Sequence, residues 1–129
     1  MEESTLKYWK DAGHVARRTL EAMKLELTPG KTFHEVIESA ERYIHRHGGK
    51  PAFPGTIAVN DLAAHFTTDH SVNTVEGWDG EMVLQKGDCV KIDFGVHIKG
   101  HIADNALTFE IGNGNEHTEQ IKAAKEARD

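Results

Sequence analysis

The clearest pattern in the chain is an alternation of apolar and polar residues that begins at residue 89. Over residues 89–98 every even position is apolar, and the odd positions are mostly polar. A period of two residues predicts a β-strand that is buried on one face. The sequence then reads Lys99-Gly100 and resumes the alternation, which predicts a tight two-residue turn and a second, antiparallel strand.

This turn fixes how the two predicted strands pair. A two-residue loop at Lys99-Gly100 places Gly95 opposite Asp104 and Asp93 opposite Ala106. The same register brings the apolar residues of the second strand to the apolar face of the first, as a hairpin with one buried side requires. These apolar residues are Leu107, Phe109 and Ile111.

Two helices are predicted before the hairpin. Residues 4–27 have apolar residues at every third or fourth position, and Thr28-Pro29-Gly30 ends this run. The second helix begins with a capping box, in which Thr32 and Glu35 bind each other's backbone N–H groups. It ends at Gly48-Gly49, where one glycine takes the left-handed C-cap conformation. The side chains expected to be buried are Phe33, Val36, Ile37, Ala40 and Ile44, and those expected at the surface are His14, His34, His45 and His47.

The remaining segments give weaker signals. Two prolines keep residues 50–54 extended, and short strands are predicted over residues 56–60 and 62–67. Residues 68–87 form an irregular connection that ends in a turn before the hairpin. A last helix begins at residue 117 or 118, and the sequence stops at Asp129 without a cap or breaker. We therefore expect the gene to continue further.

Composition narrows the class of protein. A chain of 129 residues corresponds to a single domain, here of the α+β class. The net charge of −6, without a basic cluster, argues against a nucleic-acid partner. The single cysteine, Cys89, excludes an internal disulfide and suits a reducing compartment, and we expect it to serve in packing. The sequence has neither a signal peptide nor a membrane-spanning apolar run, which predicts a cytoplasmic protein that binds no membrane.

The polar face of the hairpin carries the candidate chemistry. The register makes Asp93 and Asp104 diagonal neighbours on that face, roughly 7–8 Å apart at the backbone. Two carboxylates this close repel each other unless a cation compensates their charge. Only Gly95 and Ala106 stand between them, which leaves room for one or two divalent metal ions. A solvated face with two unrelated acids explains the spacing equally well.

Four motifs, taken in order, resemble type II methionine aminopeptidases of the archaeal kind. The likeness extends along nearly the whole chain, from the first predicted helix to the last. The combination of P-A-F-P and A-A-H favours type II over type I and over the proline-specific peptidases of the same fold. The motifs are residues 50–54 (K-P-A-F-P), Asn60 with residues 63–67 (A-A-H-F-T), residues 91–97 (K-I-D-F-G-V-H) and residues 100–104 (G-H-I-A-D).

This resemblance implies the N-terminal half of a pita-bread fold, with a curved antiparallel sheet covered by helices. It also implies two divalent metal ions (Co, Mn, Fe or Zn) in the complete site, with Asp93 as a terminal ligand and Asp104 as a bridging ligand. His65 matches a histidine that contacts the substrate near the scissile amide. Phe53 matches an aromatic wall of the pocket for the methionine side chain. The implied substrate is a peptide with an N-terminal methionine.

Three functions compete at this stage. The chain is the N-terminal half of a metal-dependent aminopeptidase, inactive or weakly active because the family's remaining histidine and two glutamate ligands follow Asp129. Alternatively, it is a half-fold interaction module that forms a homodimer through its exposed sheet edge. The third reading is a non-catalytic relative that acts as a binding protein, and retention of both aspartates, His65 and Phe53 counts against it.

Overall fold

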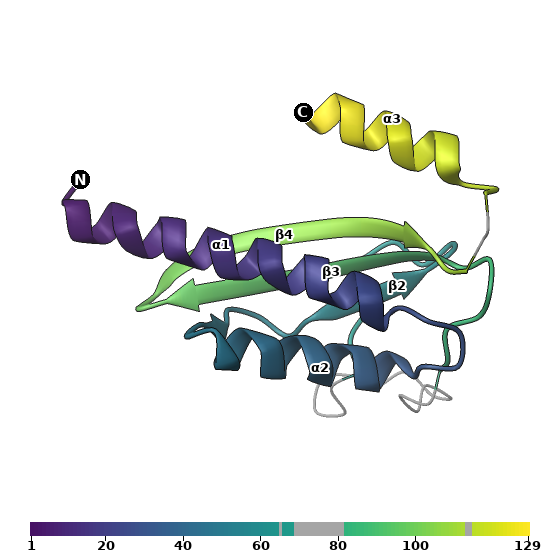
Figure 1. Ribbon diagram of the computed structural model, residues 1–129, viewed down its shortest axis with the longest axis horizontal. Coiled ribbons are helices and arrows are strands. Elements are labelled where there is room, and N and C mark those ends of the chain that lie inside the picture. The colour runs from purple at the N-terminus through teal and green to yellow at the C-terminus, as the bar shows by residue number, and fades with distance from the viewer. Residues whose placement is uncertain (65, 69–81, 113–114) are drawn as a thin grey trace.

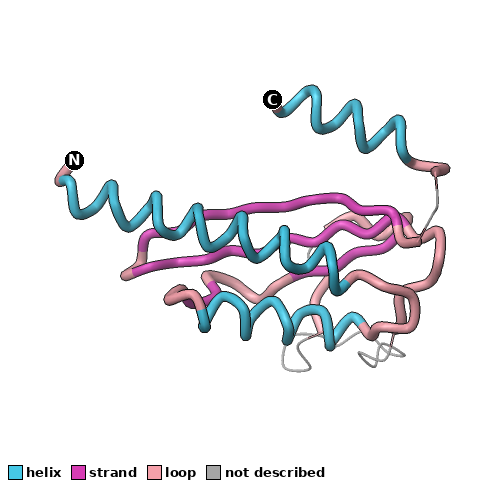
Figure 2. Tube along the Cα trace, in the orientation of Figure 1, coloured by secondary structure: helices cyan, strands magenta, loops and turns pink. Residues whose placement is uncertain are grey.

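An antiparallel sheet with two helices on one of its faces forms the body of the molecule (Figures 1 and 2). The computed structural model describes residues 1–129 except residues 65, 69–81 and 113–114. A third helix follows the last strand and lies apart from the other two (Figure 1). The elements in chain order are α1 (Glu3–Glu26), α2 (Phe33–Arg46), β1 (Lys50–Pro51), β2 (Thr56–Val59), β3 (Cys89–Ile98), β4 (His101–Glu110) and α3 (Thr118–Arg128).

The predicted hairpin is confirmed residue by residue. In the β3–β4 pair, Gly95 faces Asp104 and Asp93 faces Ala106. The turn residues Lys99 and Gly100 both have positive φ angles, 50° and 81°, as a type I′ turn requires. Strand β3 is central, because β4 pairs with one edge and both β1 and β2 pair with the other, all antiparallel.

The hydrophobic core lies between the helices and one face of the sheet. Helix α1 packs on β3 and β4, and α2 packs on β1, β2 and α1. The capping box of α2 is present, and Gly48 has a φ of 85° at its C-terminal end. Each fully buried aliphatic or aromatic side chain here contributes roughly 1.5–3 kcal/mol. The buried residues of α2 are Phe33, Val36, Ile37, Ala40 and Ile44, as predicted, and those of β3 include Val90, Ile92, Phe94 and Val96.

The apolar stripe of α1 is buried only from Ala12 onward, and Leu6 and Trp9 are 43% and 41% exposed. One predicted element is wrong. The described part of residues 62–67 does not form a strand. Asn60 turns the backbone with a φ of 54°, and the bond from Ile57 N–H to the Phe66 carbonyl (2.9 Å) does not develop into a ladder among the described residues.

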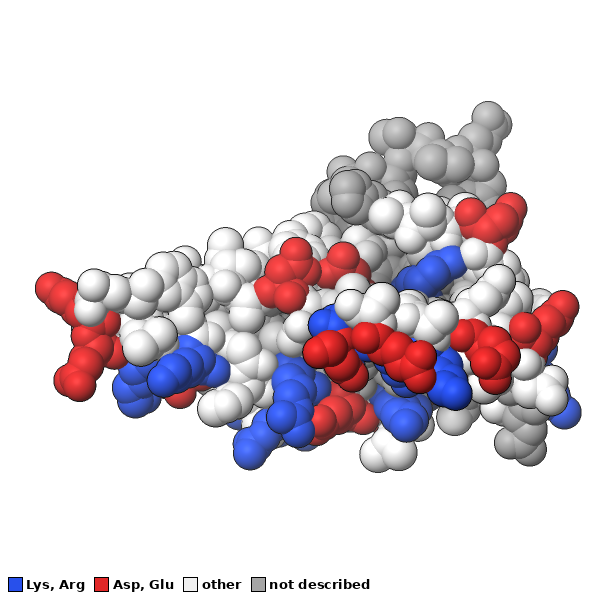
Figure 3. Space-filling view, turned by 90° about the horizontal axis from the view of Figure 1, so that it is seen from above, with Lys and Arg blue, Asp and Glu red and all other residues white. Residues whose placement is uncertain are grey.

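The surface of the described chain is polar and mixed in charge. The four helix histidines, His14, His34, His45 and His47, are exposed, as predicted. Helix α3 buries no side chain. Figure 3 shows acidic and basic groups interspersed over the face seen from above. Within the described ranges, no helix has both the length and the apolar character needed to cross a membrane.

Candidate metal and substrate site

Asp93 and Asp104 lie on the sheet face that α1 and α2 leave uncovered. We call this the aspartate face; it comprises Lys91, Asp93, Gly95, Asp104, Ala106 and Thr108, which the register places on one side of the hairpin. Asp93 lies in the middle, between Thr56 of β2 and Ala106 of β4. One of its carboxylate oxygens is buried, whereas Asp104 is exposed. The predicted diagonal placement of the two aspartates on one face is therefore confirmed.

Phe53 occupies the space at Gly95. A Cβ atom added to Gly95 would lie 2.1 Å from Cε1 of the Phe53 ring, well inside van der Waals contact. The Ala52 N–H donates to the Gly95 carbonyl at 2.9 Å and so holds the segment with Phe53 against β3. The prediction of open space at both residues between the aspartates is therefore wrong at Gly95. The ring of Phe53 fills that position, and Ala106 is exposed.

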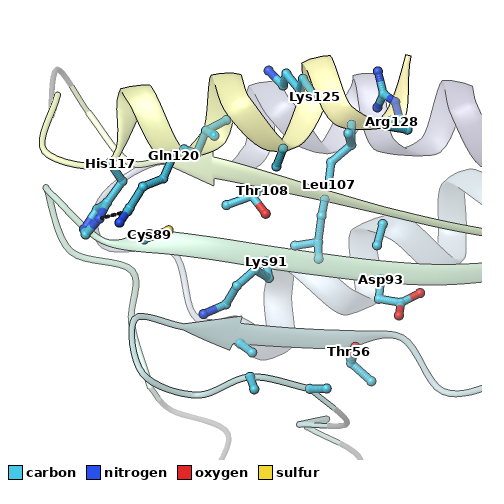
Figure 4. Close-up of a pocket in the computed structure, with 17 residues that line it drawn as sticks. Thr56, Cys89, Lys91, Asp93, Leu107, Thr108, His117, Gln120, Lys125 and Arg128 are labelled. Carbon is cyan, nitrogen blue, oxygen red and sulfur yellow. Dashed lines mark hydrogen bonds between the residues drawn. The ribbon is translucent and has the colours of Figure 1, made fainter.

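A cavity of about 450 Å³ opens beside Asp93, between the aspartate face and α3 (Figure 4). The sheet contributes Thr56, Lys91, Asp93 and Thr108, and α3 contributes an exposed helical face. Among the described residues, one carboxylate and several cationic side chains therefore border the cavity. These cationic residues are Lys91, Lys125 and Arg128.

The carboxylates of the aspartate face could serve as ligands of a divalent metal ion. Carboxylate oxygens are suitable ligands for Mn²⁺, Fe²⁺ and Zn²⁺, and a half-buried carboxylate beside a second one gains from a divalent cation. Among the described residues, however, no group of three or more His, Cys, Asp or Glu side chains is placed to hold a metal ion. Asp93 and Asp104 fit as two ligands of a larger set. His65, for which a substrate contact is predicted, lies outside the described residues.

The sequence interpretation assigned no role to Lys91, although it stands two residues before Asp93. Its ammonium donates a hydrogen bond of 2.6 Å to the Asn60 carbonyl. Asn60 has a left-handed backbone with a φ of 54°. The signal in the sequence was an asparagine at the end of a predicted strand, because asparagine adopts this conformation more readily than most residues.

Comparison with solved structures defines the fold. The methionine aminopeptidase from Thermotoga maritima matches with a TM-score of 0.83 and 24% identity, over 98% of this chain and 50% of that structure. The enzyme of the same name from Rickettsia prowazekii gives 0.81 and 20%, again over 98% and 50%. The fold is therefore half of a pita-bread fold, as the sequence motifs predicted.

Sequence comparison identifies the family. The family model described as "Metallopeptidase family M24" matches residues 7–129, and the chain belongs to this family. A methionine aminopeptidase from Thermococcus onnurineus is 40% identical over 116 residues, which are 90% of this chain and 36% of that protein. One from Archaeoglobus fulgidus is 37% identical over 127 residues, or 98% and 40%. The chain thus spans little more than a third of the length of these archaeal relatives.

Proposed function

We propose that this chain supplies one half of the active site of a metal-dependent aminopeptidase that removes N-terminal methionine. The observation that carries the proposal is the placement of Asp93 and Asp104 on one sheet face, with the Phe53 ring lying on the glycine between them. Membership in the M24 family and the archaeal methionine aminopeptidase relatives support it. Nascent chains carry their initiator methionine in the cytoplasm, which is where we place the protein.

In this proposal each of the four candidate site residues has a defined task. Asp93 and Asp104 would hold divalent metal ions through their carboxylate oxygens, in a complete site of two ions. Such ions, when bound, lower the pKa of water toward ~7 and polarise the scissile carbonyl. Phe53 would contact the methionine side chain of the peptide. His65 would donate a hydrogen bond to the substrate beside the scissile amide.

The chain by itself is expected to bind divalent metal weakly and to turn over little or no substrate. Two carboxylates provide fewer ligands than a divalent ion requires, and the chain spans only 36% to 40% of the two archaeal relatives. Titration with Mn²⁺ or Co²⁺, followed by a cleavage assay on Met-Ala-Ser, tests both statements. Measurable cleavage that is abolished by Asp104→Asn would contradict the proposal that this chain holds only half of the active site. Absence of any divalent binding would contradict the metal role of the aspartates.

A second candidate function is self-association through β4. Among the described strands, β4 pairs only with β3, so its other edge is open to a strand from a second copy. The hairpin register directs the N–H of Thr108 to this outer edge. Thr108→Pro would therefore remove a donor from the edge without removing one from the β3 ladder. A dimer in light scattering that Thr108→Pro converts to a monomer supports this candidate, and a monomer at all concentrations contradicts it.

A further inference from the structure

We infer that Asn60 is a positioning residue that holds the Lys91 ammonium away from Asp93. This inference rests on the proposed metal role of Asp93. It assigns to Asn60 the task of keeping a competing cation of the chain itself out of the metal site.

Lys91 is close enough to Asp93 to compete with a metal ion. The two residues stand two positions apart on one strand and share a face, so their Cα atoms are roughly 6.5 Å apart. The four-carbon stem of lysine can span this distance. Yet none of the ion pairs of the described residues joins Lys91 to Asp93. Figure 4 shows the Lys91 side chain directed toward the end of β2, away from Asp93.

The Asn60 carbonyl accounts for this direction. It accepts the Lys91 ammonium at 2.6 Å, a short charge-assisted hydrogen bond. The carbonyl points to Lys91 because the backbone of Asn60 is left-handed. A residue with a branched or bulky side chain would pay a steric cost for this conformation, whereas asparagine and glycine adopt it readily.

Three further hydrogen bonds fix Asn60 at the start of β3. The Cys89 N–H donates to Oδ1 of Asn60 at 3.0 Å, and the Asn60 N–H donates to the Cys89 carbonyl at 2.9 Å. Nδ2 of Asn60 donates to Oδ1 of Asp88 at 3.1 Å. Glycine would keep the backbone conformation but lose the two side-chain bonds. Alanine would lose both the bonds and the conformational preference.

A released ammonium would lower the affinity of Asp93 for a divalent cation. An ammonium about 4 Å from the Asp93 carboxylate in water competes with the metal ion for this carboxylate and lowers the metal affinity by about fivefold. We therefore expect Asn60→Ala to weaken Mn²⁺ binding by about this factor. The double variant Asn60→Ala/Lys91→Met should restore the wild-type affinity, because it removes the competing charge. Lys24→Met, which removes the same charge at the end of α1, is the matched control.

Two measurements keep the inference testable if Asn60→Ala fails to fold. Lys91→Met alone should change Mn²⁺ affinity no more than Lys24→Met does, since the ammonium is already held away from Asp93. The NMR signal of the Lys91 ammonium, measured without metal, should be protected in the wild type and stay protected in Asn60→Gly, because glycine keeps the left-handed backbone whose carbonyl binds the ammonium.

The outcomes separate this inference from the proposed function. Failure of the wild-type chain to bind Mn²⁺ contradicts the metal role of Asp93, and the ammonium signal then decides the placement of Lys91. A Lys91→Met variant that binds Mn²⁺ severalfold more tightly than Lys24→Met would overturn the role of Asn60. So would a double variant that binds no better than Asn60→Ala, or an unprotected Lys91 ammonium in the wild type.

Discussion

The aromatic ring of Phe53 lies directly on the backbone of Gly95, so that a Cβ atom on Gly95 would stand 2.1 Å from Cε1 of the ring. Gly95 faces Asp104 across the hairpin and stands two residues after Asp93. The contact joins the candidate pocket wall to the strand that carries one of the two aspartates. It also explains why this strand has a glycine where its neighbours have side chains.

Substitution of Gly95 by alanine should destabilise the fold by about 1–3 kcal/mol, because the new methyl group displaces the Phe53 ring. Urea denaturation measures this change. Gly13→Ala is the matched control, since a Cβ at Gly13 meets nothing within 4 Å and alanine favours a helix. The double variant Phe53→Ala/Gly95→Ala should be less destabilised than the sum of the two single variants. Strict additivity would show that the ring and the methyl group do not meet.

Replacement of either aspartate of the pair should weaken divalent metal binding. We expect Asp93→Asn and Asp104→Asn each to lower Mn²⁺ affinity by at least roughly tenfold. Loss of a group that only hydrogen-bonds to a metal ligand already lowers metal affinity by about tenfold or more, and loss of the ligand itself should lower it further. Isothermal titration calorimetry gives the affinities. Asp61→Asn removes the same charge from an exposed turn and serves as the control. Equal losses of Mn²⁺ affinity in Asp61→Asn and Asp104→Asn would show that the loss comes from the change in net charge and not from a missing ligand.

Acid should weaken the N-terminal end of α2. The Thr32 backbone N–H and side chain hydrogen-bond to the Glu35 carboxylate, and this holds the pKa of Glu35 below its usual value of 4.5. A lowered pKa in the folded state stabilises the protein above the unfolded-state pKa, and this contribution is lost as the pH falls through the folded-state pKa. Urea midpoints measured between about pH 3 and 6 should therefore fall less steeply for Glu35→Gln than for the wild type. Parallel slopes would contradict this assignment.

The hairpin turn should be sensitive at Gly100. Its φ of 81° lies in the left-handed region, where a Cβ atom costs roughly 1–2 kcal/mol. Gly100→Ala should therefore lower the free energy of unfolding by this amount, although nothing lies within 4 Å of the added Cβ. Gly13→Ala again provides the comparison. A Gly100→Ala variant as stable as the wild type would show that the turn relaxes to another type.

The sequence by itself determined the hairpin register, the capping box of α2 and the shared face of Asp93 and Asp104. These features depend on periodicity and on residues close in the chain, so local pattern was enough. The identity of the family followed from motifs in order, and the M24 match and the archaeal relatives confirm it. Any claim about His65 stays a prediction, because this residue lies outside the described part of the structure.

Only the tertiary structure decided what meets on the aspartate face. The contact of Phe53 with Gly95 joins residues 42 positions apart by number, and the bond between Lys91 and Asn60 spans 31. The described part of residues 62–67 follows the left-handed Asn60 and forms no strand, although its sequence predicts one. Alternation predicts the side of a sheet on which a residue lies, but not which distant segment packs there, because that contact is set by the path of the chain between them.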